Sequence, residues 1–175
     1  MAALCLAGAD LAAAGQDDLR GGLLAEYFNI DEEIQDFPAL APDRKPEVRR
    51  IEKQVNYEST DGKFAETDMA DCFYVRWKGV VRVPKDGKYV FYTESDDGSR
   101  LWINGKQVVD NPGCHAMEEK SGEVELKAGD HEIKIDLFEN MGGAGIKVSW
   151  ETEGLAKEII PEKALFHPKD KELDK

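Results

Sequence analysis

The sequence contains few cysteines and no paired-cysteine motif. Cys5, Cys72 and Cys114 are the three cysteines, an odd number, and none of them stands in a Cys-x-x-Cys pair. This absence excludes a zinc ribbon and a dithiol redox motif. In an exported domain Cys72 and Cys114 either form a disulfide or remain free thiols, because spacing alone does not reveal connectivity.

Long apolar runs and helical periodicity are also missing. No apolar stretch approaches the roughly 18 residues of a membrane-spanning helix, so we expect no insertion into a membrane. Apolar residues almost nowhere recur every three or four positions, which argues against a helical fold. The 175 residues are enough for one domain with its own core and too few for two.

Basic residues are outnumbered by acidic ones. The chain has 23 Lys and Arg against 36 Asp and Glu, which gives a formal net charge of −13. Such an excess repels phosphate backbones, so nucleic acid is not an expected partner. The excess suits a divalent cation, although solubility alone is the simpler explanation because the acidic residues are spread along the chain.

What the sequence does contain is a series of short segments with alternating apolar residues. This alternation predicts half-buried strands, which are separated by turns rich in Gly and Pro. The predicted strands are 22–29, 73–83, 89–93, two within 99–109, 123–127, 133–137, 146–150 and 159–161. Short strands with a turn every ten residues or so predict an all-β antiparallel fold, either a sandwich or a barrel.

Two segments between these strands carry few strand signals. Residues 31–70 contain three prolines and many charges, and they are predicted to form a long irregular excursion with one short strand near 48–51. Residues 110–120 are predicted to form a second loop.

The two ends of the chain differ in composition from its middle. The Ala-rich residues 1–20 resemble a leader or the remnant of a signal peptide, which favours an extracytoplasmic or secreted protein. We take residues 21–167 as the domain. Residues 168–175 are rich in Lys, Asp and Glu and are predicted to be a frayed, charged tail.

The segment 89–109 says most about function. Asp96 and Asp97 follow one predicted strand, and Asn104-Gly105 after the next strand predicts a tight type I′ hairpin. The two carboxylates are therefore expected at a loop tip on a rigid β scaffold, where binding residues often lie. The same Asp-Asp-Gly sequence also makes a good turn with self-bonding side chains, so a purely structural role stands beside a binding role.

Five motifs follow one another along the chain: FYVRWKG at 73–79, GKYVF at 87–91, SDDGSRLWING at 95–105, LKAGDH at 126–131 and GGAGIKVSW at 142–150. Together they resemble the PA-fourteen domain family, named after the N-terminal fragment of anthrax protective antigen. The family also occurs in yeast flocculation adhesins and in exported bacterial glycosidases. The resemblance spans about residues 23–166 and implies a β-sandwich with a barrel-like twist. In the adhesin members it also implies calcium-dependent sugar binding, although fold does not fix function.

The resemblance implies a set of site residues. In the adhesins two adjacent aspartates joined by a cis peptide bind calcium, together with an asparagine and backbone carbonyls from a later loop. Asp96 and Asp97 match the aspartate pair, and Asn140 matches the asparagine, just before the loop that contains Gly142 and Gly143. Calcium, the implied cofactor, takes roughly six to eight oxygen ligands. It would also relieve the repulsion between neighbouring carboxylates, about 4 kcal/mol at 4 Å and an effective dielectric constant near 20.

An aromatic side chain often contributes to a sugar site of this kind, and Trp102 and His115 are the local candidates. Packing on the sheet is the commoner explanation for Trp102, and a polar loop position is the commoner one for His115. Trp77 and Trp150 are expected in the core.

The sequence as a whole predicts a non-catalytic, lectin-like module of an exported protein that binds carbohydrate through calcium, with a glycan or polysaccharide as its partner. The alternative is a structural or protein-interaction β-sandwich without a sugar site, accessory to a larger exported enzyme or assembly. A hydrolase is disfavoured because the two carboxyls of a glycosidase flank the scissile bond at about 5–9.5 Å, which adjacent aspartates do not. The sequence also offers no Ser-His-Asp set and no cluster of metal-binding histidines.

Overall fold

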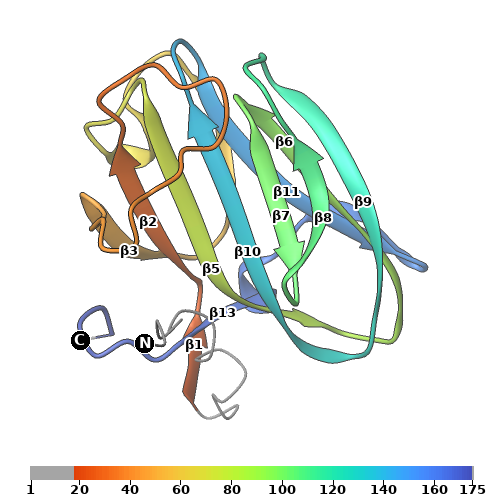
Figure 1. Cartoon of the computed structure of the whole chain (residues 1–175). Coiled ribbons are helices and arrows are strands. Elements are labelled where there is room, and N and C mark those ends of the chain that lie inside the picture. The colour runs from red at the N-terminus through yellow and green to blue at the C-terminus, as the bar shows by residue number, and fades with distance from the viewer. Residues whose placement is uncertain (1–17, 175) are drawn as a thin grey trace, which may run out of the picture.

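The computed structural model describes residues 18–174, whose strands form two antiparallel sheets (Figure 1). In this part of the chain the larger sheet has eight strands: β1 (Leu19–Gly21), β2 (Leu23–Asn29), β3 (Val48–Glu52), β5 (Phe73–Val83), β7 (Ser99–Ile103), β8 (Lys106–Asn111), β10 (Gly129–Glu139) and β13 (Leu165–Pro168). The smaller sheet has five: β4 (Asn56–Thr60), β6 (Gly87–Asp96), β9 (Glu118–Leu126), β11 (Ala144–Thr152) and β12 (Leu155–Ile159).

The longest strands lie at the centre of each sheet because their apolar residues alternate over the greatest length. In the larger sheet β5 pairs with β10 in an antiparallel register that runs from Phe73↔Glu139 to Val83↔Gly129. In the smaller sheet β6 pairs with β11 in the same sense, and Asp96 lies opposite Gly145. Every second side chain of these strands points between the sheets, as the pleat of a strand requires.

The hydrophobic core lies between the two sheets and is rich in aromatic side chains. Its buried aromatic residues are Tyr27, Phe64, Phe73, Trp77, Tyr89, Phe91 and Trp150. The expectation that Trp77 and Trp150 are core residues is confirmed. The predicted all-β antiparallel sandwich is also confirmed, and the two sheets do not close into a barrel.

On one side of the sandwich the edges of the two sheets approach each other closely. Here β9, in the smaller sheet, passes against β8, in the larger one. A side-chain carbon added at Gly122 would lie only 1.7 Å from the backbone oxygen of Val108. Glycine is therefore required at this position because no larger residue leaves room for the backbone of β8.

Two loops that each connect one sheet to the other meet at one end of the sandwich, the upper end in Figure 1. One loop joins β6 to β7, and the other joins β10 to β11. The register fixes their proximity, because Ser99 at the start of β7 lies opposite Leu137 in β10, and Asp96 lies opposite Gly145 in β11. The aspartate pair and the glycine-rich loop are thus brought together.

Several elements differ from the prediction. Residues 31–70 contain the expected short strand as β3, but they also contain β4, which is polar and largely exposed and so lacks an apolar alternation. Strand β9 begins at Glu118, inside the predicted loop 110–120. The sequence did not reveal the first half of this strand because its residues are exposed and lack an apolar alternation. In place of the strand predicted at 159–161, β12 ends at Ile159 and β13 follows.

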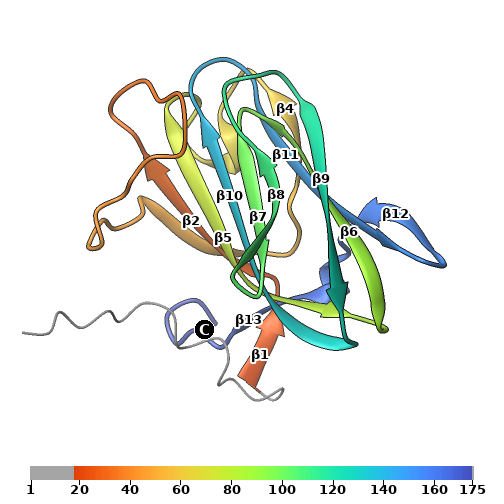
Figure 2. The same cartoon turned by 45° about the vertical axis from the view of Figure 1, so that its right-hand side comes forward.

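The C-terminal segment, predicted to be a frayed tail, makes several contacts with the sandwich over residues 168–174. Arg49 forms an ion pair with Asp170, and the imidazole of His167 bonds the carboxylate of Asp174. The backbone N–H of Lys169 donates to the backbone oxygen of Asp18 at 2.8 Å. These contacts lie beside β1 and β13, at the end of the molecule opposite the two loops (Figures 1 and 2).

The cysteines, the expected leader and the expected absence of a membrane-spanning helix compare with the structure as follows. Cys72 and Cys114 are free thiols in the structure. Residues 1–17 of the expected leader, with Cys5, lie outside the described residues. Within the described part of the chain, no helix has the length and apolar character needed to cross a membrane.

Candidate metal centre

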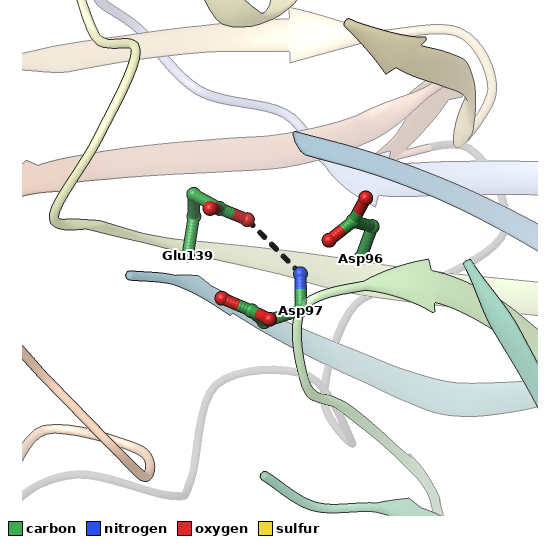
Figure 3. A group of neighbouring side chains, drawn as sticks. All are labelled: Asp96, Asp97 and Glu139. Atoms are coloured by element: carbon green, nitrogen blue, oxygen red, sulfur yellow. Dashed lines mark hydrogen bonds between the residues drawn. The ribbon is translucent and has the colours of Figure 1, made fainter. Parts of the chain in front are cut away.

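Three carboxylates converge where the two loops meet. Asp96 ends β6, Asp97 follows it, and Glu139 ends β10, and one oxygen of each lies within 4.8 Å of an oxygen of the others. Figure 3 shows the side chains of Asp96 and Glu139 pointing toward each other across the backbone nitrogen of Asp97. The carboxylates of the aspartate pair therefore do not diverge, and a third acid joins them.

Glu139 was not among the predicted site residues. Every second side chain in the second half of β10 lies on the inner face of the strand. The four residues on this face are buried: Ile133, Ile135, Leu137 and Glu139. The strand predicted at 133–137 ended two residues too early to include the glutamate. Continuing the same alternation by one step is the sequence signal that would have found it.

The peptide between Asp96 and Asp97 is cis, as the family resemblance implied. Backbone amides hold the second aspartate from both sides. The N–H of His115 donates to Oδ1 of Asp97 at 2.7 Å, and the N–H of Asn140 donates to Oδ2 at 3.0 Å. The N–H of Asp97 itself donates to Oε2 of Glu139 at 3.0 Å. The orientation of Asp97 is thus fixed by the protein backbone, and no basic side chain neutralises it through these bonds.

The first aspartate is held by β4, the strand that the sequence did not predict. The hydroxyl of Ser59 donates to Oδ2 of Asp96 at 3.2 Å. A side-chain carbon at Gly143 would lie 2.8 Å from that hydroxyl and 2.9 Å from the same carboxylate oxygen. The absence of a side chain at Gly143 therefore leaves room for Asp96.

Burial and mutual repulsion disfavour negative charge in this cluster. Burial raises the pKa of Glu139 to about 8, and the neighbouring carboxylates of Asp97 and Asp96 add to the effect. Burial likewise raises the pKa of Asp96, with a further contribution from Asp97, while the hydrogen bond from Ser59 opposes the shift. Both shifts follow from placing acids together away from water.

The donor set fits a hard divalent cation. Oε1 of Glu139 is buried and has no hydrogen-bond partner among the described residues, and Glu139 itself is 0% exposed. Buried polar atoms are nearly always paired, so an oxygen of this kind beside two other carboxylates matches what a cation requires. Oxygen donors without imidazole or thiolate suit calcium or magnesium better than zinc or copper.

The structure places three other predicted residues beside the cluster. Asn140 contacts Asp97 through its backbone, while its side-chain oxygen accepts from the N–H of Ile34 at 3.1 Å. Gly142 donates its N–H to Oδ1 of Asp71 at 3.0 Å. His115 lies next to the cluster through its backbone, and Nε2 of its ring is buried without a partner among the described residues.

The structure does not bring Trp102 to this cluster. Strand β7 runs away from the aspartate pair, and Trp102 lies three residues beyond Ser99, roughly 10 Å at about 3.3 Å per residue. Leu101 and Ile103 point into the core, so Trp102 lies on the outer face of the sheet. Nζ of Lys134 covers its ring at 3.5 Å from the ring centroid.

A ladder of buried hydroxyl and amide groups lies beneath the aspartates, and the sequence did not reveal it. Ser95 donates to Ser99 at 2.7 Å, and Ser99 donates to Thr93 at 2.8 Å. The amide of Asn111 donates to Ser95 at 3.2 Å. Thr93 and Ser95 lie on β6, Ser99 lies on β7 and Asn111 lies on β8, and all four are buried. They support the inner side of the loop that carries Asp96 and Asp97.

A family model for the PA14 (PA-fourteen) domain matches residues 20–164. The chain belongs to the PA14 domain family. This agrees with the resemblance inferred from the five motifs and with the sandwich architecture.

The relatives of this PA14 domain include anti-sigma factor proteins and an adhesin domain. The anti-sigma-I factor RsgI3 of Acetivibrio thermocellus is 31% identical over 146 residues, which cover 83% of this chain and 21% of the relative. A solved anti-sigma factor domain-containing protein from Clostridium clariflavum is 28% identical with a TM-score of 0.72, and the match covers 87% of this chain and 49% of that chain. This PA14 domain thus spans about half of the solved relative and much less of RsgI3.

A third relative is a solved PA14 sugar-binding domain from an RTX adhesin. It is 21% identical, with a TM-score of 0.73, and the match covers 84% of this chain and 98% of that one. At this identity the likeness concerns the fold. The PA14 sandwich is therefore found both as a part of longer anti-sigma proteins and in an adhesin.

Proposed function

We propose that this PA14 domain is a non-catalytic, calcium-dependent carbohydrate-binding module of an exported protein. The observation that carries the proposal is the buried, unpartnered oxygen of Glu139 beside the aspartate pair. Asp96, Asp97 and Glu139 would hold the calcium ion. When bound, the ion supplies a positively charged centre for the hydroxyl oxygens of a sugar.

The residues of the chain prepare this site in three ways. Two backbone amides orient the carboxylate of Asp97, so little conformational entropy is lost when a cation binds. Ser59 orients Asp96 from the neighbouring strand. Gly142 and Gly143 place no side chain beside Asp96, which allows a ligand to approach it.

The two kinds of relative support two different roles for this domain. The RTX adhesin domain is described as sugar-binding, which supports a glycan as the ligand. The anti-sigma relatives contain the same module as part of a longer regulatory protein, which supports the alternative of a protein-interaction or structural module. The two proposals differ in one result: the alternative expects no sugar to bind, whether or not the site holds calcium.

The test measures calcium and sugar separately. Native mass spectrometry of the wild-type protein is expected to show one bound calcium ion, which Asp96→Asn and Glu139→Gln each remove. A glycan array probed with and without a chelator is expected to show sugar binding that depends on calcium. Glu125→Gln serves as a matched control because it changes an exposed acid at the other end of β9.

Three outcomes separate the proposals. Absence of a bound calcium ion contradicts the metal centre. A bound ion without binding to any glycan favours the structural or protein-interaction module. Sugar binding that survives both the chelator and Asp96→Asn would place the sugar site elsewhere on the molecule.

A further inference from the structure

Two more carboxylates stand at the rim of the candidate metal centre, and neither was predicted as a site residue. Asp61 follows β4, and its Oδ1 would lie 3.5 Å from a side-chain carbon at Gly143, a point only 2.9 Å from Oδ2 of Asp96. Asp71 precedes β5, and its Oδ1 accepts the N–H of Gly142 at 3.0 Å. Both side chains are exposed, and they lie beside two consecutive glycines of the loop, Asp61 beside Gly143 and Asp71 beside Gly142.

The groups around this rim are almost all negatively charged. The charges that act most strongly on Glu139 come from Asp97, Asp96 and Asp71. Those that act on Asp96 come from Asp97, Asp61 and the single base His115. Neither set of strongest charges includes a lysine or an arginine.

Nearby lysines face elsewhere. Lys147 lies on the outer face of β11, where it pairs with Glu58 at 2.8 Å. Lys63, in the loop after β4, pairs with Asp68. Their charges are therefore already compensated, which leaves no lysine among these neighbours to receive an anionic group at the rim.

One calcium ion does not neutralise this arrangement. When all three inner carboxyls are ionised around the ion, its two positive charges balance two of them, and Asp61 and Asp71 remain at the entrance. A sugar hydroxyl can donate a hydrogen bond to these carboxylates, whereas a carboxylate on the sugar can only accept and is repelled. The buried, unpartnered oxygen of Glu139 marks the same cluster as a binding site independently of the rim.

We propose that the rim residues Asp61 and Asp71 set the ligand class: the site binds uncharged sugars and discriminates against uronic acids. This inference rests on the proposed function. It makes Asp61 and Asp71 specificity-determining residues and assigns the excursion before β5 a part in ligand selection.

The experiment compares matched oligosaccharides on one array at a fixed concentration of free calcium: glucose with glucuronic acid, galactose with galacturonic acid, and mannose with mannuronic acid. In each pair that binds, the acid is expected to bind about tenfold more weakly at low salt. The difference is expected to narrow at about 0.5 M salt, because ions screen the exposed rim. An acid that binds as tightly as its neutral partner, or more tightly, overturns the inference.

A charge-removing variant tests the two rim residues directly. Asp61→Asn with Asp71→Asn keeps an oxygen acceptor for Gly142 and is expected to reduce the neutral-to-acid ratio about threefold or more. Glu125→Gln with Glu153→Gln removes the same charge from exposed positions at the opposite end of the sandwich, and the ratio should not move. Equal changes in the two double variants would assign the effect to net charge and refute a role for the rim.

The same array separates this inference from the proposed function. If no pair shows calcium-dependent binding, the proposed function fails and the inference fails with it. If neutral sugars bind and uronic acids bind equally well, the lectin function stands and the role of Asp61 and Asp71 alone is rejected.

Discussion

Glu139 combines a buried carboxyl group with an unused hydrogen-bond acceptor. One carboxylate oxygen holds the N–H of Asp97, and the other has no partner among the described residues. A glutamine in its place would keep the first contact and remove the repulsion from Asp96 and Asp97. The two effects of the residue, on stability and on cation binding, can therefore be separated by a single substitution.

We expect Glu139→Gln to stabilise the calcium-free protein by roughly 1–3 kcal/mol, because a buried carboxylate beside two others costs about that much. Chemical denaturation in the presence of a chelator measures this change. Added calcium is expected to stabilise the wild-type protein and to leave the variant unchanged. An equal calcium-induced stabilisation of both proteins would exclude Glu139 as a ligand.

Gly143 offers a second test at the scale of one residue. Gly143→Ala is expected to weaken calcium binding by about tenfold, because the new carbon displaces the carboxylate of Asp96 and the hydroxyl of Ser59. Isothermal titration with calcium gives the affinity. Gly62→Ala is the control, since its added carbon would lie 3.6 Å from Thr60, an ordinary contact. Unchanged affinity in Gly143→Ala would show that Asp96 does not bind the ion.

At the scale of elements, the core strands were predictable and the exposed ones were not. Strands β5, β6, β10 and β11 bury every second side chain, so their apolar alternation appears in the sequence. Strands β4 and β9 are largely exposed, and their polar residues carry no such signal. The aspartate pair was predictable from its motif. Ser59, Asp61 and Asp71 were not, because only the folded excursion brings them to the loop.

The C-terminal segment after β13 is an element held by charge. The hydrogen bond from Arg49 holds the pKa of Asp170 below its usual range. The hydrogen bond from the backbone N–H of Asp170 likewise lowers the pKa of Asp174. A lowered pKa in the folded protein means that this contribution is present above the unfolded value, near 3.9, and is lost as pH falls through the folded value. The segment is therefore expected to detach on acidification below about pH 4.

Hydrogen exchange of residues 169–174 measures that detachment. Protection is expected at neutral pH and its loss is expected in acid, before the core strands exchange. Arg49→Gln should remove much of the protection even at neutral pH, since Arg49 also lies near Glu26 and Glu172. Protection that persists unchanged in the variant would mean that the ion pair does not hold the segment.

At the scale of the whole molecule, the close approach of β8 and β9 joins the two sheets along one edge. We expect Gly122→Ala to lower the free energy of unfolding by roughly 1–3 kcal/mol, because backbone atoms on both strands must separate. Denaturation by urea measures the loss. Gly21→Ala is the control, because an added carbon there would meet no atom within 4 Å. If both variants unfold alike, the contact with Val108 is not a constraint on the fold.

The pairing of β1 with β13 has a consequence for how a larger protein can carry this sandwich. Leu19 lies opposite Pro168, so the polypeptide enters and leaves through two neighbouring strands at the end farthest from the acidic loops. A domain with neighbouring entry and exit strands can be inserted into a surface loop of a larger protein with two short linkers. Two adjacent linkers would restrict rotation of the domain and keep its acidic loops directed away from the larger protein.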